Sequence, residues 1–175
     1  MISRRGFLKT VLAASAVFQF GTAGAFAAPN PERTLNLYNI HTEESLDICY
    51  YSGGRYDYDA LDKINYLLRC HYTNKVKTIA VGVIDLLSDI SSKIAPGQRL
   101  RIISGYRSPE YNEYLRDIGR HVARHSYHMR GLAIDFAVDG IRTKKIAGVA
   151  KSFDSGGVGL YPEFVHIDVG PVRYW

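Results

Sequence analysis

Hydrophobic and polar residues alternate in several short segments of the chain, and this alternation predicts β-strands. Residues 34–39 alternate in this way, and residues 46–50 repeat the pattern after a polar turn at 41–44. Two alternating segments joined by so short a turn predict a β-hairpin. Further strands are predicted at 100–104, 158–161 and 164–169.

Hydrophobic residues spaced three or four positions apart predict helices in four other segments. These segments are 58–72, 78–94, 109–124 and 143–153. The third has a strong start signal, because Ser108 can cap its first turn and Pro109 lacks an N–H that would have no partner there. The buried stripe expected for this helix consists of Tyr111, Leu115, Ile118 and Val122. Helices and strands do not alternate strictly, so we expect an α+β fold with helices packed on a largely antiparallel sheet.

Residues 128–138 are also predicted to form a strand, and one face of this strand is almost free of large side chains. That face holds Gly131, Ala133, Asp135 and Ala137, whereas the opposite face is uniformly large and apolar. Glycine and alanine contribute little packing at such positions. We therefore expect the space beside the Asp135 carboxylate to hold a ligand, and our candidate is a metal ion with its substrate.

A second half-polar strand is predicted at 164–169, where His166 and Asp168 share a face. If the two half-polar strands are neighbours in the sheet, His128, Asp135 and His166 converge on one surface. Two imidazoles and one carboxylate are typical of a catalytic zinc site, which keeps its fourth position open for water. The alternative is that each histidine is a hydrogen-bonded structural residue.

The amino-terminal segment predicts export by the twin-arginine pathway. Arg4 and Arg5 precede an apolar, alanine-rich run, and small residues stand before the junction at Ala27. We expect a signal peptide at 1–27, a single domain at 28–175 and a periplasmic location. The alternative is a retained membrane anchor, although the apolar run is short for a span of about 20 residues.

Charge and composition exclude some partners. Removal of residues 1–27 takes away three basic residues and no acidic one, so the formal net charge falls from +5 to +2. A nearly neutral domain offers no electrostatic basis for binding nucleic acid. The remaining 148 residues suffice for one compact domain with one core. We expect this domain to have no membrane span and to act as a monomer.

The chain contains two cysteines, Cys49 and Cys70. An oxidising compartment would allow them to form a disulfide, whereas two separate buried thiols are the alternative. Their spacing does not decide between the two.

Several separated motifs carry a resemblance to a known family. Residues 126–135 fit the pattern S-x-H-x-x-G-x-A-x-D of the LAS metallopeptidases. That group comprises zinc D-alanyl-D-alanine carboxypeptidases and dipeptidases, murein endopeptidases and the hedgehog amino-terminal domain. Residues 104–108 and 164–175 resemble the YcbK (MepK) type of murein endopeptidase in particular. The resemblance covers nearly all of the chain after the signal and implies a hedgehog/D-Ala-D-Ala peptidase-like fold.

The resemblance also implies one zinc ion per chain, and the ligands that it assigns are His128, Asp135 and His166. A general base would take a proton from the attacking water. Glu163 has the spacing from the last ligand that relatives use, although the segment around it is shorter than in many of them. Asp168 is the competing candidate, and its alternative role is to orient an imidazole.

Three other residues are candidates for contacts with the reacting groups. The resemblance implies that Arg107 stabilises the developing oxyanion, a role that suits a fixed positive charge, whereas a buried salt bridge is the alternative. Ser126 would lie beside the substrate or would cap the end of the preceding helix. Tyr106 belongs to a group of tyrosines that would flank an extended substrate or serve as ordinary packing residues.

We therefore expect a zinc-dependent murein endopeptidase that hydrolyses peptide bonds in peptidoglycan cross-links. The first alternative is a D,D- or L,D-carboxypeptidase acting on wall peptides. The second is a non-catalytic, zinc-containing module that binds the cell wall and lacks a working base. The third is a metal-free structural protein.

Overall fold

An eight-stranded sheet forms the framework of the computed structural model, which describes residues 31–175. The strands are β1 (Arg33–Asn39), β2 (Ser45–Ser52), β3 (Arg55–Tyr56), β4 (Leu100–Ser104), β5 (Ala133–Val138), β6 (Gly157–Leu160), β7 (Val165–Asp168) and β8 (Arg173–Tyr174). Their order across the sheet is β3-β2-β1-β4-β5-β7-β6-β8. The pairs β1–β4 and β6–β8 are parallel, and the other pairs are antiparallel. The expected α+β class with a largely antiparallel sheet is confirmed.

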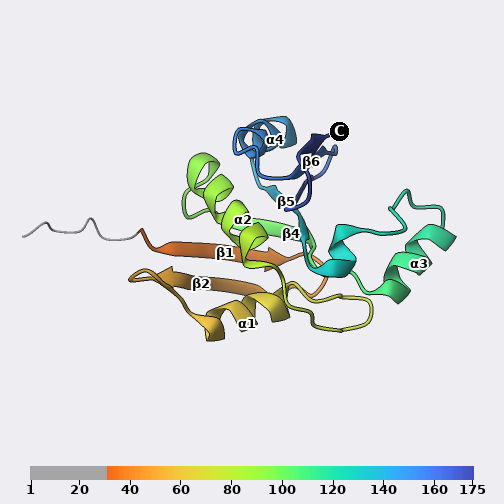
Figure 1. The fold of residues 1–175 in the computed structure, drawn as a ribbon, viewed down its shortest axis with the longest axis horizontal. Coiled ribbons are helices and arrows are strands. Elements are labelled where there is room, and N and C mark those ends of the chain that lie inside the picture. Colours follow the sequence, from red (N-terminus) through yellow and green to blue (C-terminus); the bar gives the residue numbers. More distant parts are fainter. Residues whose placement is uncertain (1–30) are drawn as a thin grey trace, which may run out of the picture.

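Four α-helices and one 3₁₀ turn connect these strands in the described part of the chain. They are α1 (Tyr58–Leu67), α2 (Val81–Ile94), α3 (Pro109–Asp117), the 3₁₀ turn η1 (Tyr127–Arg130) and α4 (Thr143–Lys151). Figure 1 shows α2 and α4 close to the sheet, whereas α3 projects away from it. Within residues 31–175, no helix is both long enough and apolar enough to cross a membrane.

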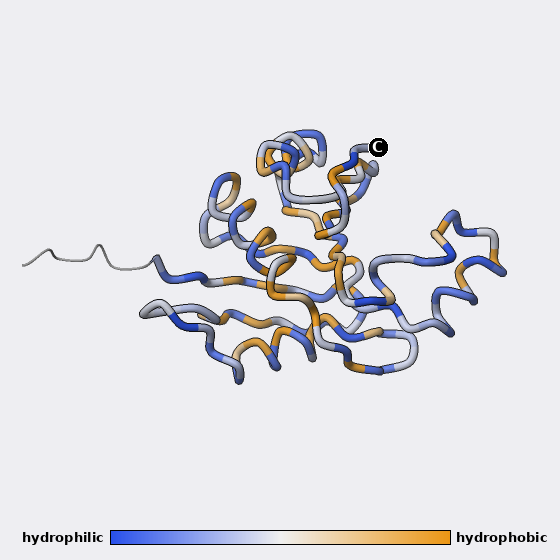
Figure 2. The backbone as a smooth tube through the Cα atoms, viewed as in Figure 1, coloured by the Kyte–Doolittle hydropathy of each residue, from blue (hydrophilic) through white to orange (hydrophobic). Residues whose placement is uncertain are grey.

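One hydrophobic core joins the sheet to α1, α2 and α4. Its fully buried members include Leu37, Ile64, Leu87, Phe136 and Ile167, which come from three strands and two helices. Hydrophobic and hydrophilic positions are interspersed along the chain (Figure 2), and β5 and β7 are buried at every position. Each large apolar side chain of this kind contributes roughly 1.5–3 kcal/mol by leaving water. The core therefore fixes the sheet whose strands carry the candidate site.

All four predicted helices are shorter in the structure, and two of them end five or more residues early. The helix expected over 58–72 ends at Leu67, whose carbonyl accepts a hydrogen bond of 2.8 Å from the Asn39 side chain. The helix expected to reach residue 124 ends at Asp117, and Gly119 follows with a φ of 79°. A left-handed residue at this point stops a helix.

The buried stripe predicted for α3 is wrong. Asn112 is its buried residue, whereas Ile118 is 53% exposed and Tyr111, Leu115 and Val122 are only half-buried. The physical reason is that α3 projects away from the sheet and has no apolar layer to cover (Figure 1). Its start was predicted correctly, because the Ser108 hydroxyl accepts a hydrogen bond of 3.2 Å from the Tyr111 N–H.

The strand predicted from His128 onward begins only at Ala133. His128 instead lies in η1, and Gly131 ends this turn with a φ of 68°. A Cβ atom on Gly131 would lie 2.3 Å from the Thr78 carbonyl oxygen. The small residue at 131 therefore serves a close backbone contact, and our expectation that it leaves room for a ligand is corrected.

Both cysteines are free thiols. Cys49 is exposed on β2, and Cys70 is buried. The two side chains thus form no disulfide, and the alternative of two buried thiols holds for Cys70 alone. The predicted signal peptide lies outside the described residues, so cleavage after Ala27 stays a prediction.

Candidate metal centre

Strand pairing brings Asp135 and His166 together. In the antiparallel pair β5–β7 the two residues are direct cross-strand partners, and such partners point to the same face of a sheet. His128 joins them from η1, which precedes β5 in the chain. One ligand atom from each of the three side chains lies within 4.8 Å of the other two. The convergence expected from the sequence is confirmed.

The His128 ring is oriented by a backbone carbonyl. Its Nδ1 atom lies 2.8 Å from the carbonyl oxygen of Gly105. A carbonyl oxygen can only accept a hydrogen bond, so Nδ1 carries the proton in the neutral ring. The lone pair of Nε2 therefore faces the cluster, where it is 3.2 Å from His166 Nδ1 and 3.2 Å from Asp135 Oδ2.

The His166 ring is oriented by a carboxylate on its opposite edge. Its Nε2 atom lies 2.9 Å from Asp168 Oδ2, and its Nδ1 atom lies 2.8 Å from Asp135 Oδ1. A hydrogen bond from Nε2 to Asp168 leaves Nδ1 free to bind an ion. Each imidazole thus presents one nitrogen to the same point and has its other nitrogen fixed.

The spacing of these three side chains fits one small cation. Ligands held at about 2.0–2.1 Å from a tetrahedral zinc ion are about 3.3 Å apart. His128 Nε2 lies 3.2 Å from His166 Nδ1 and 3.2 Å from Asp135 Oδ2, and His166 Nδ1 lies 2.8 Å from the other Asp135 oxygen, Oδ1. Two nitrogens and one oxygen leave one tetrahedral position without a protein ligand, which is the arrangement of a catalytic site.

Burial and charge shift the pKa values in this cluster. Burial raises the pKa of Asp135, but the two neighbouring histidines outweigh burial and hold this pKa well below its usual range. Burial lowers the pKa of His166, but its hydrogen bonds to Asp135 and Asp168 outweigh burial and raise this pKa to about 9. A cation would occupy the same electrostatic position as the proton of His166.

Asp168 is held on the side of His166 that faces away from the cluster. It is fully buried, and both of its oxygens are engaged. Oδ1 accepts hydrogen bonds from the backbone N–H groups of Gly157 and Gly170, at 3.1 and 2.8 Å. The guanidinium of Arg173 donates to both oxygens, at 3.1 and 2.6 Å. Burial raises the pKa of Asp168, but the contacts with His166 and Arg173 outweigh it and lower this pKa.

The cluster opens into a pocket of about 270 Å³. Arg107 lines it, and Nη2 of Arg107 lies 3.8 Å from Asp135 Oδ2. The Nε atom of Arg107 is buried and has no hydrogen-bond partner among residues 31–175. Burial lowers the pKa of this guanidinium, and Asp135 acts in the opposite direction. An inward-facing cation with a free donor is suited to binding a negatively charged or carbonyl group.

The other predicted site residues lie at different distances from the pocket. Ser126 is buried in its wall, and its side chain makes no capping hydrogen bond to η1. Glu163 is exposed and is not among the residues that line the pocket. Tyr106 also lies outside the pocket lining, where its ring packs against the core and faces Lys77 Nζ at 5.8 Å.

Sequence reasoning missed several residues of the pocket. Phe164, Trp175 and His121 line it and were not predicted, whereas Tyr161, which also lines it, belongs to the group of tyrosines predicted to flank a substrate. Arg173 lines the pocket and is the ion-pair partner of Asp168. Phe164, Arg173 and Trp175 lie within the closing motif at 164–175, but His121 carried no such signal, because side-chain periodicity does not report contacts between distant segments.

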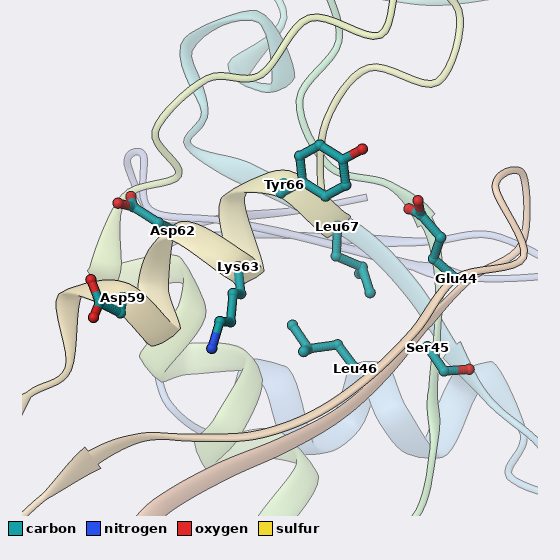
Figure 3. A pocket seen from close by; sticks show the side chains of 8 residues that line it. All are labelled: Glu44, Ser45, Leu46, Asp59, Asp62, Lys63, Tyr66 and Leu67. Carbon is teal, nitrogen blue, oxygen red and sulfur yellow. The ribbon is translucent and has the colours of Figure 1, made fainter.

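A larger hollow of about 670 Å³ lies between β2 and α1. Figure 3 shows Leu46 and Leu67 facing each other across it, whereas Asp59 and Asp62 point away from its centre. Its lining includes no histidine and shares no residue with the cluster of His128, Asp135 and His166. The smaller pocket, and not this larger hollow, therefore carries the candidate chemistry.

Comparison with known proteins agrees with this geometry. The family model described as peptidoglycan L,D-endopeptidase MepK matches residues 27–175. The peptidoglycan L,D-endopeptidase MepK of Escherichia coli strain K12 is 41% identical over 151 residues, which cover 85% of this chain and 82% of that protein. The probable peptidoglycan L,D-endopeptidase MepK of Haemophilus influenzae is 36% identical over 152 residues, which cover 85% of this chain and 81% of that protein.

Proposed function

This chain belongs to the peptidoglycan L,D-endopeptidase MepK family, and from that membership we propose that it is a metallopeptidase that hydrolyses peptide bonds in peptidoglycan cross-links. The observation that carries the proposal is the set of three potential ligand atoms, from His128, Asp135 and His166, at the base of an open pocket beside Arg107. Peptidoglycan lies outside the cytoplasmic membrane, so the proposal includes an extracytoplasmic location. We further propose export to the periplasm by the twin-arginine pathway, which Arg4 and Arg5 before an apolar run support.

We propose zinc as the ion, with one ion per chain. The donor set supports this choice, because two neutral imidazoles and a carboxylate suit zinc better than the all-oxygen sites of magnesium or calcium. The fixed ring orientations of His128 and His166 support it further, since little rearrangement is needed for binding. When bound, zinc would activate both the scissile carbonyl and the attacking water as a Lewis acid.

Arg107 would stabilise the negative charge that develops on the carbonyl oxygen during hydrolysis. Its guanidinium is fixed in the pocket wall, and its contact with Asp135 is a single one at 3.8 Å. A structural salt bridge would be expected to show shorter, paired contacts. The buried Nε atom without a partner among the described residues gives further support to a role toward the substrate.

Glu163 is the residue that we propose as general base. It precedes His166 by three positions, and its side chain is exposed beside Phe164, which lines the pocket. Asp168 is the less suitable carboxylate, because Arg173 and two backbone N–H groups occupy its oxygens on the far side of the imidazole. We assign Asp168 to orienting His166.

Ser126 and Tyr106 complete the proposed contacts with substrate. The Ser126 hydroxyl makes no capping bond and lies in the pocket wall, which supports a hydrogen bond to the peptide backbone. Tyr106 would act only at a distance from the cluster, because it does not line the pocket.

The experiment is digestion of purified sacculi by protein loaded with zinc, followed by mass analysis of the released fragments. Loss of cross-linked dimers with gain of monomers is the expected result, and chelation should stop it. Release of terminal residues alone would replace the endopeptidase by a carboxypeptidase. Metal binding without any cleavage would favour the non-catalytic wall-binding module, and protein without stoichiometric metal would contradict the metallopeptidase.

A further inference from the structure

An aromatic wall covers one side of the metal cluster, and the hydrolytic mechanism gives it no task. The ring centroid of Trp175 lies 5.3 Å from that of His166. Next to it, Tyr161 and Phe164 stack with their ring centroids 4.5 Å apart and their planes 17° apart. All three rings line the pocket that leads to the cluster.

The sheet register explains how an indole reaches this position. Asp135 pairs with His166 across β5–β7, and His166 pairs with Gly159 across β7–β6. The three residues therefore form one row on one face of the sheet. Gly159 has no side chain, and a Cβ atom there would lie only 2.7–2.8 Å from the Trp175 ring. The indole thus occupies the place in the row that a third side chain would otherwise fill.

Several independent contacts hold Trp175 in this place. Its N–H donates to the Val158 carbonyl at 3.2 Å, and its carbonyl accepts from the Leu160 N–H at 2.9 Å. Its indole Nε1–H donates to the Tyr161 hydroxyl at 3.0 Å. The guanidinium of Arg173 lies 5.0 Å from the ring, and the same guanidinium is bound by Asp168. The ring therefore lies against the guanidinium that holds Asp168, the residue that orients His166.

Despite these contacts, Trp175 is 48% exposed. A rigidly held aromatic ring with a free surface in a binding pocket loses little conformational entropy when a ligand packs on it. We propose that Trp175 is a substrate-positioning residue, whose indole packs against the aliphatic part of the wall peptide next to the scissile bond. The inference rests on the proposed function, since it names how that same pocket holds its peptide.

The first test compares variants in steady-state cleavage of purified cross-linked muropeptide dimers. Trp175→Ala should raise KM by at least about tenfold with a smaller change in kcat, because loss of apolar contact from a pocket costs roughly 10- to 200-fold in discrimination. Trp175→Phe keeps an aromatic ring and should restore most of the loss. Tyr58→Ala removes an exposed aromatic ring on α1 and should leave both constants unchanged.

Metal content and folding separate positioning from a merely structural role. Zinc stoichiometry and the circular dichroism spectrum of Trp175→Ala should match those of the parent. A parental KM in Trp175→Ala would overturn the inference. A loss of activity that follows loss of zinc or of folded structure, and that Trp175→Phe does not reverse, would overturn it as well.

A second measurement needs no variant, because Trp175 is the only tryptophan in the chain. Mixing the zinc-loaded parent with the muropeptide dimer in a stopped-flow instrument should change the tryptophan emission before the first turnover is complete. Unchanged emission at saturating peptide would refute packing against the indole. An emission change without any cleavage would support the inference and contradict the proposed hydrolysis, so the two failures are distinguishable.

Discussion

Replacement of Asp168 by asparagine tests whether the hydrogen bond between Asp168 and Nε2 of His166 controls the affinity of the candidate site for zinc. Asp168 is fully buried and accepts five hydrogen bonds, from His166, from both Arg173 nitrogens and from two backbone N–H groups. Asparagine keeps the size of the side chain but removes its charge and half of its acceptor capacity. Removal of a partner that orients a ligand typically costs 10- to 100-fold in metal affinity.

The same substitution should lower the free energy of unfolding. It leaves the Arg173 guanidinium without its carboxylate, and Arg173 is partly exposed, so water replaces part of the lost interaction. We expect a cost of about 2–3 kcal/mol, which is in the range for a lost hydrogen bond to a charged group and below that for a fully buried pair. Because folding lowers the pKa of Asp168, this contribution is present above the ordinary pKa of aspartate and is lost as the pH falls below it.

The assay combines competition for zinc against a chelator with urea unfolding of the metal-free protein. Asp139→Asn is the matched control, because Asp139 pairs with Arg101 at 3.1 Å on an exposed surface. Such an exposed pair contributes at most about 1 kcal/mol to the free energy of unfolding, and neither of its residues is a candidate metal ligand. Parental zinc affinity in Asp168→Asn would refute the orienting role. A loss confined to kcat, with affinity and stability intact, would instead identify Asp168 as the general base.

Three further predictions concern the site and its framework. His166→Ala should abolish cleavage of muropeptides and weaken zinc binding while the circular dichroism spectrum stays that of the parent, and cleavage at the parental rate would contradict the mechanism. Zinc affinity should rise as the pH increases from about 6.5 to about 9, because the raised pKa of His166 makes a proton compete with the ion. The charged ring stabilises the metal-free fold below 6.5, so the free energy of unfolding of the metal-free protein should fall over the same interval. Chelator competition and urea unfolding at several pH values would measure the two trends. Gly131→Ala should lower the free energy of unfolding in urea by about 3 kcal/mol, because a Cβ would strain a left-handed residue and meet a carbonyl oxygen at 2.3 Å. Gly140→Ala is the control, with a φ of 75° and no atom within 4 Å of the added Cβ, and should cost only about 1–2 kcal/mol. Equal costs would show that the contact at residue 131 is unimportant.

Local patterns predicted most of the elements. The alternation at 34–39 and 46–50 gave the hairpin of β1 and β2, and the apolar run at 100–104 gave β4 with its observed bounds. These predictions succeeded because the spacing of hydrophobic residues along an element indicates which of its sides faces the core. The same rule failed for α3, where apolar residues at helical spacing lie on a helix that has no partner layer.

The candidate ligands were also predictable, although not for the reason first given. The small residues near Asp135 were taken as space for a metal ion, yet Gly131 is small because the Thr78 carbonyl approaches it. His128 was placed on a strand and reaches the cluster from a 3₁₀ turn instead. The convergence itself was right, because it depended on the neighbouring strands β5 and β7, whose pairing sets Asp135 opposite His166.

The sequence by itself determined the chemistry of the candidate ligands, the family, and which side chains of most strands face the core. These features depend on residue identity and on the local spacing of hydrophobic residues. Only the tertiary structure decided which nitrogen of His166 faces the cluster, because that choice is set by Asp168 and by the Arg173 that holds it. Only the tertiary structure brought Trp175 beside His166, through the parallel pairing of β8 with β6. Such contacts depend on strand order and register across the sheet, which no short segment encodes.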